Sequence, residues 1–409
     1  MPRAVARAVP WGQELGVAGV CLYVVGVALP FDWNLPLVLL ASSGLVGTLG
    51  AVRRPSRFES SRLHLLVLAF VAAVGLSTLA SGDMGRSLRL SAPLLPGILL
   101  FLLCAQQGRT RRHLQLLYLS MSVASAWLSA SVIWAALRSS VTDPVTWVGT
   151  LNSPLLIVPN DIAWASVVAP LSLVVLLRDP RSLAAGLAAI ALLGGVSAVV
   201  LLQSRVAALT LLVCMLGFGL VLRHRLVLPL VAVGFSVALL VDALMGFPLV
   251  SKFVDLRHWD GTGRLPVWVA AWSMFLDAPV LGHGPHTFGL YYRPYLEGLT
   301  FPQWVSVDPR LMPWPHNVYL EVLAEQGLVG FVLFGALLVC GASTAWRALR
   351  QDDQGSGTRL YAGGALAALV GLALAGLLEL SLLRQWVVIL LFVVLGVIAR
   401  LSSGRVLED

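Results

Sequence analysis

Twelve apolar stretches divide this chain of 409 residues, and they set narrow bounds on its fold. Each is close to the length that a helix needs to cross the ~30 Å hydrocarbon core of a bilayer. The stretches lie at 15–29, 34–52, 63–81, 90–107, 114–137, 156–177, 183–203, 206–222, 226–244, 318–346, 360–379 and 385–399. The pattern predicts an all-α integral membrane protein with about twelve transmembrane helices.

The composition leads to the same class of protein. Hydrophobic residues make up 58% of the chain and charged residues only 12%, whereas soluble domains average about 45–50% and about 25%. A soluble core of this length cannot bury that much apolar surface. A soluble globular enzyme, a disordered chain and a nucleic-acid-binding module are therefore excluded.

The basic residues predict the orientation of the chain. Arginines gather in the connections at 53–62, 109–112, 178–181, 223–225 and 347–359. With a cytoplasmic N-terminus, one side carries 18 basic residues and the other carries 10. The positive-inside rule therefore places both termini in the cytoplasm. The first stretch has no small-residue cleavage site, so we expect a retained helix rather than a signal peptide.

One connection is much longer than the others and faces outward in this topology. It covers residues 245–317 and divides the chain into a nine-span region (1–244), the loop itself and a three-span region (318–409). A long loop in a compact membrane protein is more often functional than not. Within it, the spacing of Trp268, Trp272 and Phe275 predicts an amphipathic helix over Leu265–Leu276 that lies on the membrane face. For the individual tryptophans, we favour the simpler interpretation that they anchor the loop at the interface.

Arg205 is the first candidate for a functional charge. It lies in the short turn between the seventh and eighth stretches, at or just inside the outer membrane boundary. An ionisable side chain at that depth is costly, which favours a functional role. The alternative is that Arg205 extends to the lipid phosphates.

Gly261-Thr262-Gly263-Arg264 is the second candidate, because it directly precedes the amphipathic stretch. The glycines permit close backbone approach, and a helix N-terminus with a guanidinium beside it favours a phosphate. An ordinary glycine-rich turn with an exposed arginine would have the same sequence.

His316 begins the tenth stretch, in Trp314-Pro315-His316-Asn317. The positive end of a helix disfavours a second positive charge and so favours a neutral imidazole, which can act as a general base. The alternative is a capping or interface histidine. His283 and His286 are weaker candidates, because we expect their glycine-rich segment to be flexible.

For the other polar residues, the sequence is compatible with two different roles. Arg86 and Arg89 would either add positive charge to an outer cleft or remain solvated. Asn160-Asp161 marks either a helix start near the outer surface or an unwound site of the kind seen in transporters.

No metal site is expected from the sequence. No His-x-x-x-His or Asp-x-Asp pair occurs, and the spacing of Asp255 and Asp260 specifies no ligand set. The four cysteines lie in apolar stretches and form neither a disulfide framework nor a metal-ligand motif. The net charge of +8 comes from 27 arginines and Lys252, which reflects either GC-rich codon use or phosphate binding.

Taken in order, the motifs of the second half resemble the O-antigen ligase and polymerase superfamily of bacterial envelope proteins. The matching features are Gly263-Arg264, the tryptophan-rich helix, the run 278–284, His316-Asn317 and the Glu325-x-Gly-x-x-Gly330 run. The twelve-span layout with a late outward loop is also similar. The first half of the chain matches only in hydropathy.

The resemblance implies an inverting, metal-independent glycosyltransferase without a cofactor. Such a protein would move a glycan from undecaprenyl pyrophosphate to the lipid A–core oligosaccharide, on the periplasmic side of the bacterial inner membrane. It implies His316 as the general base and Arg205 with Arg264 as the pyrophosphate ligands, with Arg86, Arg89 and Asn317 as further substrate-binding residues. The ligase branch is the better match, and an O-antigen polymerase is the alternative.

A transporter is the alternative from another class, because twelve spans also suit secondary carriers. Such carriers often have repeated halves with polar breaks at matching positions. The break at Asn160-Asp161 has no partner in the second half, and the polar residues gather at the outer face rather than at the midplane. The sequence therefore favours the glycosyltransferase.

Overall fold

The computed structural model describes residues 11–29, 34–52, 61–140, 143–151, 153, 155–222, 226–246, 248–254, 264–302, 305, 307–350 and 355–402. Over these ranges the protein is all-α, with no β-strand. The predicted fold class is therefore confirmed.

Each of the twelve apolar stretches contains a helix. These helices are α1 (Trp11–Ala28), α2 (Asn34–Val52), α3 (Arg62–Leu79), α4 and α5 (Met84–Ser91, Leu94–Gln107), α6 (Arg111–Arg138), α8 (Ala163–Arg178), α9 (Leu183–Leu201), α10 (Arg205–Leu222), α11 (Val227–Leu244), α15 (Val318–Arg350), α16 (Gly355–Gly376) and α17 (Gln385–Leu401). The described part of the chain holds nine helices long and apolar enough to cross a membrane, while α1, α2 and α17 are shorter apolar helices. The protein is thus a multi-pass membrane protein.

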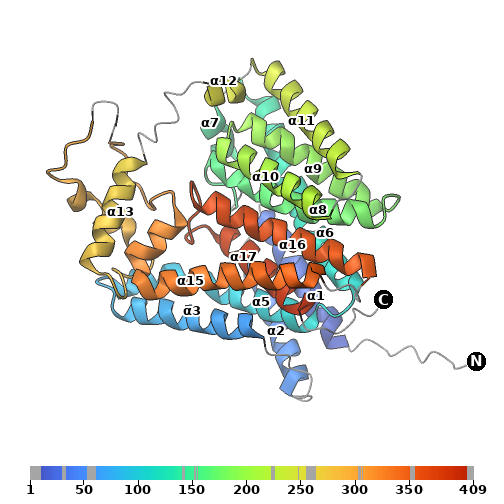
Figure 1. Ribbon diagram of the computed structural model, residues 1–409, viewed down its shortest axis with the longest axis horizontal. Helices are drawn as coiled ribbons and strands as arrows, with labels where there is room; N and C mark the ends of the chain where they lie inside the picture. Colours follow the sequence, from blue (N-terminus) through green and yellow to red (C-terminus); the bar gives the residue numbers. More distant parts are fainter. Residues whose placement is uncertain are drawn as a thin grey trace, which may run out of the picture.

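The centre of the bundle is built on α8, α16 and α17. Helix α16 packs against both α8 and α17, while α9 and α10 cover α8, and α5 covers α17. Every residue from Trp386 to Leu401 is buried, and so is most of α8. Figure 1 shows α9, α10 and α11 at one side of this centre, and α3 and α15 side by side at the other.

Small residues allow these central helices to approach closely. A Cβ atom built on Gly371 would lie 2.5 Å from Cys214 Sγ, and one on Gly396 would lie 2.7 Å from the Phe101 carbonyl oxygen. Because lipid is as apolar as a leucine side chain, helices in a membrane associate through close packing rather than through the hydrophobic effect. The glycines supply that packing.

The long connection between α11 and α15 contains the helices α12 (Pro248–Val254), α13 (Leu265–Asp277) and α14 (Phe288–Tyr291) and the 3-10 turn η4 (Arg293–Leu296). Helix α13 coincides with the predicted amphipathic stretch. Its face at Val267, Ala270, Ala271 and Met274 is buried, and the helix packs on α15 (Figure 1).

Candidate active site

A single buried carboxylate joins two of the predicted site residues. Glu379, in the turn between α16 and α17, accepts a hydrogen bond from Arg264 Nη2 at 2.6 Å. Its other oxygen lies 3.0 Å from His316 Nδ1. The Glu379 side chain is only 5% exposed, whereas Arg264 and His316 are 29% and 22% exposed. Glu379 therefore holds the arginine and the histidine side by side, with both open to solvent.

Local contacts determine where His316 lies. Trp268 of α13 donates its indole N–H to the Pro315 carbonyl at 2.9 Å, so this tryptophan shapes the site instead of serving only as an interface anchor. His316 has a positive φ of 55°, a backbone conformation that non-glycine residues seldom adopt except where the surrounding structure holds them. The position of the imidazole is thus imposed by its neighbours.

Asn317 begins helix α15 by capping it. Its side-chain oxygen accepts hydrogen bonds from the backbone N–H groups of Tyr319 and Leu320, at 3.0 and 3.1 Å. Its amide nitrogen donates to the Leu377 carbonyl at 3.0 Å. Capping of this kind satisfies the free N–H groups of the first turn. The Asn317 side chain therefore ties α15 to the end of α16, two residues before Glu379.

The geometry specifies the chemistry available to His316. A carboxylate only accepts hydrogen bonds, so Nδ1 carries the proton that it donates to Glu379. The lone pair of the neutral ring is then on Nε2, which has no hydrogen-bond partner among the described residues. An imidazole oriented by a carboxylate in this way can take a proton from a hydroxyl group.

Arg205 lies in a second part of the site, at the start of α10. Its Nη1 atom is 3.5 Å from the carbonyl oxygen of Lys252 in α12. Burial and the charge of Arg205 both lower the pKa of Lys252. A polar pocket of about 520 Å³ adjoins this pair, lined by Asn160, Gln203 and Lys252 together with Asp143, Pro144, Val145, Pro159 and Leu202. Lys252 thus lines this pocket together with the carboxylate of Asp143, and Arg205 lies beside Lys252.

A chain of contacts connects the two parts. Ser204 donates a hydrogen bond to Asn160 Oδ1 at 2.8 Å. The neighbouring Asp161 forms a buried ion pair with Arg384, whose Nε lies 2.9 Å from the carboxylate. The Arg384 guanidinium in turn lies over the ring of Trp314, 5.3 Å from its centroid. Asn160-Asp161 therefore belongs to a helix start, the 3-10 turn η2 (Pro159–Ile162) before α8, and not to an unwound segment inside a helix.

Several helices of the described part of the chain begin at this end of the bundle. The contacts above join the N-termini of α8, α10, α13, α15 and α17. Each N-terminus presents the positive end of a helix dipole, which favours anions. The backbone and the arginines therefore give the same region a preference for a phosphate group.

The glycine-rich segment with His283 and His286 is fixed rather than flexible. The backbone N–H groups of His283 and Gly284 donate to the Ala324 and Glu325 carbonyls at 3.1 and 2.8 Å. The Glu325 carboxylate accepts from the N–H groups of His286 and Phe288 at 2.7 and 2.9 Å. The expectation of flexibility was wrong, because its basis, the glycine content, ignored these long-range hydrogen bonds.

His286 is removed from solvent and serves the packing of this segment. The residue is 4% exposed, and burial, with the charge of Arg86, lowers its pKa to about 4. Arg86 itself donates from Nε to the His286 carbonyl at 3.0 Å. Arg86 thus supports the loop, whereas Arg89 is exposed on α4.

The fold also brings together a set of potential metal ligands that the sequence did not predict. His286, Glu321 and Glu325 each place one ligand atom within 4.8 Å of the others. All three are buried, and both His286 Nδ1 and Glu321 Oε2 have no hydrogen-bond partner among the described residues. Separations of 35 and 4 residues match no metal-binding motif, so the sequence gave no signal for this set. Asp255 and Asp260 lie outside the described residues, as does Gly261-Thr262-Gly263.

Glu379 is the functional residue that sequence reasoning missed. It stands at the end of an apolar stretch, 63 residues after His316 and 115 after Arg264. A signal was available, because a lone carboxylate at a membrane boundary is as costly as the lone arginine at 205.

Comparison with known protein families identifies the matching segment. Residues 187–335 match the family model described as O-Antigen ligase. The matched segment runs from α9 into α15 and contains Arg205, Arg264 and His316. No curated protein gave a significant match to the chain.

Proposed function

We propose that this membrane protein, whose residues 187–335 match the O-Antigen ligase family model, is an O-antigen ligase. It would transfer O-antigen glycan from undecaprenyl pyrophosphate to a sugar of the lipid A–core oligosaccharide, on the periplasmic face of the bacterial inner membrane. The observation that carries this proposal is the bridge from Glu379 to both His316 and Arg264. This bridge supports a mechanism in which His316 is the base and the adjacent Arg264 is a phosphate ligand.

His316 acts as the general base. The acceptor hydroxyl oxygen attacks the anomeric carbon of the donor, and its proton passes to Nε2 of His316. The bond between that carbon and the pyrophosphate oxygen breaks, so that undecaprenyl pyrophosphate leaves with the electron pair and the anomeric centre is inverted. General-base catalysis typically contributes about 10²–10⁴-fold.

The leaving pyrophosphate is stabilised by fixed positive groups rather than by a metal. Arg264 uses one nitrogen for Glu379, and its other donors have no partner among the described residues. Lys252 lines the neighbouring polar pocket, and Arg205 lies beside Lys252. Guanidinium groups and helix N-termini that face a developing negative charge lower the barrier because they need no reorganisation. Indirect contributions to substrate binding come from Arg86, Arg89 and Asn317. The side chain of Asn317 contributes through its position at the start of α15.

The prenyl chain has a candidate groove next to the polar pocket. A cavity of about 420 Å³ between α9, α10 and α11 is lined almost entirely by aliphatic side chains, among them Leu192, Leu212 and Leu230. It reaches Leu249 and Phe253 on α12, the helix that carries Lys252. Helix α12 thus contributes to both the apolar cavity and the polar pocket, as the binding of a lipid pyrophosphate requires.

Purified protein with lipid-linked glycan and lipid A–core tests this function directly. We expect glycan on the core, no transfer by His316→Ala despite normal folding in detergent, and full activity in a chelator. Longer lipid-linked glycan would instead identify a polymerase. Recovery of the donor without any covalent change would favour a transporter. Activity lost in chelator and restored by a divalent ion would overturn the metal-free mechanism and turn attention to Asp255, Asp260 and the His286 cluster.

A further inference from the structure

A second polar pocket lies at the other end of the bundle. Its volume is about 270 Å³, and its lining consists of Ser61, Arg62, Leu63, Thr344, Arg347, Ala348 and Ser402. These residues come from the N-terminus of α3 and the C-terminal ends of α15 and α17. The pocket is therefore a junction of three helix ends.

This junction lies across the membrane from the Glu379 site. Helix α15 starts beside His316 and reaches the pocket at Thr344 and Arg347, and α17 starts after Arg384 and ends at Leu401. Near the far end of α3, Ser77 donates a hydrogen bond to the Glu325 carbonyl in the first part of α15. All three helices thus extend between the two ends of the bundle, and the distribution of arginines predicts that the pocket faces the cytoplasm.

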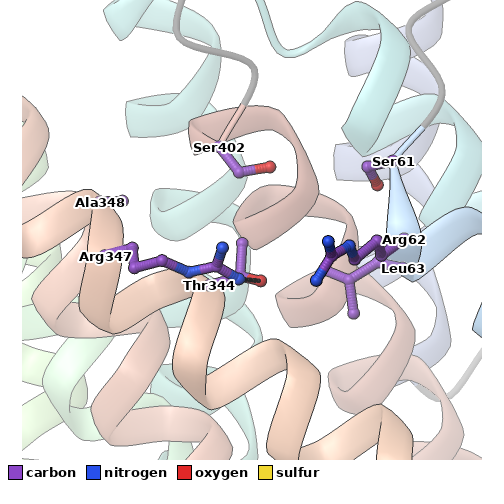
Figure 2. Close-up of a pocket in the computed structure, with 7 residues that line it drawn as sticks. All are labelled: Ser61, Arg62, Leu63, Thr344, Arg347, Ala348 and Ser402. Carbon is purple, nitrogen blue, oxygen red and sulfur yellow. Dashed lines mark hydrogen bonds between the residues drawn. The ribbon is translucent and has the colours of Figure 1, made fainter.

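The pocket presents two like charges to one space. Figure 2 shows the guanidinium groups of Arg62 and Arg347 pointing toward each other across it, with the hydroxyls of Ser61 and Ser402 at one side. Arg347 makes two long hydrogen bonds of 3.3 Å within α15, to the Ser343 carbonyl and the Thr344 hydroxyl. Arg62 has no hydrogen-bond or ion-pair partner among the described residues, and no acidic side chain is among the residues that line the pocket.

A bound anion would offset the repulsion between Arg62 and Arg347. Two arginines that face each other repel, whereas a phosphate between them gains charge-assisted, bidentate hydrogen bonds. The hydroxyls of Ser61 and Ser402 already bond to His64 Nδ1 and to the Ala399 carbonyl. The further attraction for an anion comes from the N-terminus of α3, a helix of 18 residues, through the positive end of its dipole. The buried Leu63 and Ala348 supply an apolar wall beside these donors.

We propose that this pocket binds the phosphate of an anionic phospholipid headgroup, of the phosphatidylglycerol or cardiolipin type, from the cytoplasmic leaflet. The pocket lies where the helices α3, α15 and α17 begin or end, and the ends of membrane-spanning helices meet the lipid headgroups. Basic pockets between transmembrane helices on this side are suited to such headgroups, since the leaflet carries a negative surface potential. The bound lipid would join α3, α15 and α17, the helices that extend to the active site.

Lipid retention and competition test the proposal with the full-length protein in detergent. Native mass spectrometry after partial delipidation measures binding of added phosphatidylglycerol, phosphatidylcholine and inorganic phosphate. We expect phosphatidylglycerol to bind at least about tenfold more tightly than phosphatidylcholine, and the Arg62→Gln/Arg347→Gln variant to lose that preference. The matched control is Arg350→Gln. Arg350 is exposed at the same end of α15 but lies over the ring of Trp346, 4.8 Å from its centroid, outside the pocket.

The outcomes separate the possible anions. The proposal would be overturned if the double variant kept its preference for phosphatidylglycerol. It would also be overturned if Arg350→Gln reduced that preference equally, because charge anywhere at this end would then suffice. Tight binding of inorganic phosphate that excludes the lipid would overturn it in favour of a free phosphate site. Single Arg62→Gln and Arg347→Gln variants with unchanged melting temperatures decide the matter if the double variant does not fold.

Discussion

At the scale of single residues, the central finding is that one buried carboxylate serves two partners. Glu379 hydrogen-bonds to the imidazole of His316 and to the guanidinium of Arg264. The same carboxylate therefore positions both side chains. A carboxylate hydrogen-bonded to a catalytic imidazole fixes its tautomer and stabilises the imidazolium that forms during the reaction. In the proposed reaction, the same carboxylate orients Arg264 toward the phosphate that leaves. A single side chain would thus position both the proposed base and the proposed anion ligand.

Replacement of Glu379 tests this dual role. Glu379→Gln keeps the shape of the side chain but removes its charge, so the imidazolium is no longer stabilised. We expect kcat to fall roughly 10²-fold while the donor KM changes less than tenfold, measured by glycan transfer with purified protein. Glu297→Gln is the control, because Glu297 is an exposed carboxylate of the same outer segment. An unchanged kcat in Glu379→Gln would contradict the positioning role.

The residues show where prediction from sequence ends. The sequence predicts functional roles for Arg205, Arg264 and His316, because each is a polar residue at a position that is costly for a charge or electropositive. The sequence alone reveals that property. Glu379 has the same property, but its role depends on hydrogen-bond partners that are 63 and 115 residues away in the sequence. Contacts at such separations depend on how α13, α15 and α16 pack, which local spacing does not encode.

At the scale of elements, the break in α15 explains the Glu325-x-Gly-x-x-Gly330 run. Gly327 has a φ of 62° and interrupts the helix. A Cβ atom at this residue would lie 2.3 Å from the Val280 carbonyl oxygen. The backbone N–H groups that the break frees, at Leu328 and Val329, donate to Pro279 and Val280. The loop and the helix therefore complete each other's hydrogen bonds, as buried backbone groups in a membrane protein must.

The buried imidazole of His286 makes this docked loop sensitive to acid. Its folded-state pKa of about 4 lies below the ordinary value of 6.5, so the unfolded or undocked state binds more protons between these two values. Stability is therefore fully present above pH 6.5 and is lost as the pH falls toward 4, by up to about 1.4 kcal/mol per pH unit. We expect faster hydrogen exchange at His286–Phe288 across this window, and a weaker pH dependence in His286→Gln. An identical pH dependence in His286→Gln would show that other groups are responsible.

The elements were predicted far better than their contacts. All twelve apolar stretches and the amphipathic segment at Leu265–Leu276 contain helices, because length and apolar content are properties of each segment alone. The docking of the loop on α15 was not predicted. Glycine content by itself does not distinguish a mobile segment from one whose glycines permit close backbone contact.

At the scale of the whole molecule, the two ends of the helix bundle carry different groups of polar residues. One end collects the N-termini of several helices with Arg205, Arg264 and His316, and the other carries the Arg62 and Arg347 pocket. Helices α3, α15 and α17 connect the two ends. For a glycosyltransferase that uses a lipid-linked donor, the first end must face the compartment that holds the glycan. The orientation of the bundle therefore decides whether the proposed chemistry and the proposed lipid site are on the correct sides.

Accessibility of single cysteines determines this orientation. Arg89 and Arg112 are both exposed, on α4 near the active-site end and at the start of α6 at the other end. In a background with Cys21, Cys104, Cys214 and Cys340 replaced by alanine, we expect a membrane-impermeant maleimide to label Arg89→Cys in cells with a permeabilised outer membrane. It should label Arg112→Cys only after the inner membrane is broken, because the excess of arginine holds that end in the cytoplasm. The opposite labelling would place His316 in the cytoplasm, away from a periplasmic acceptor, and would contradict the proposed ligase reaction.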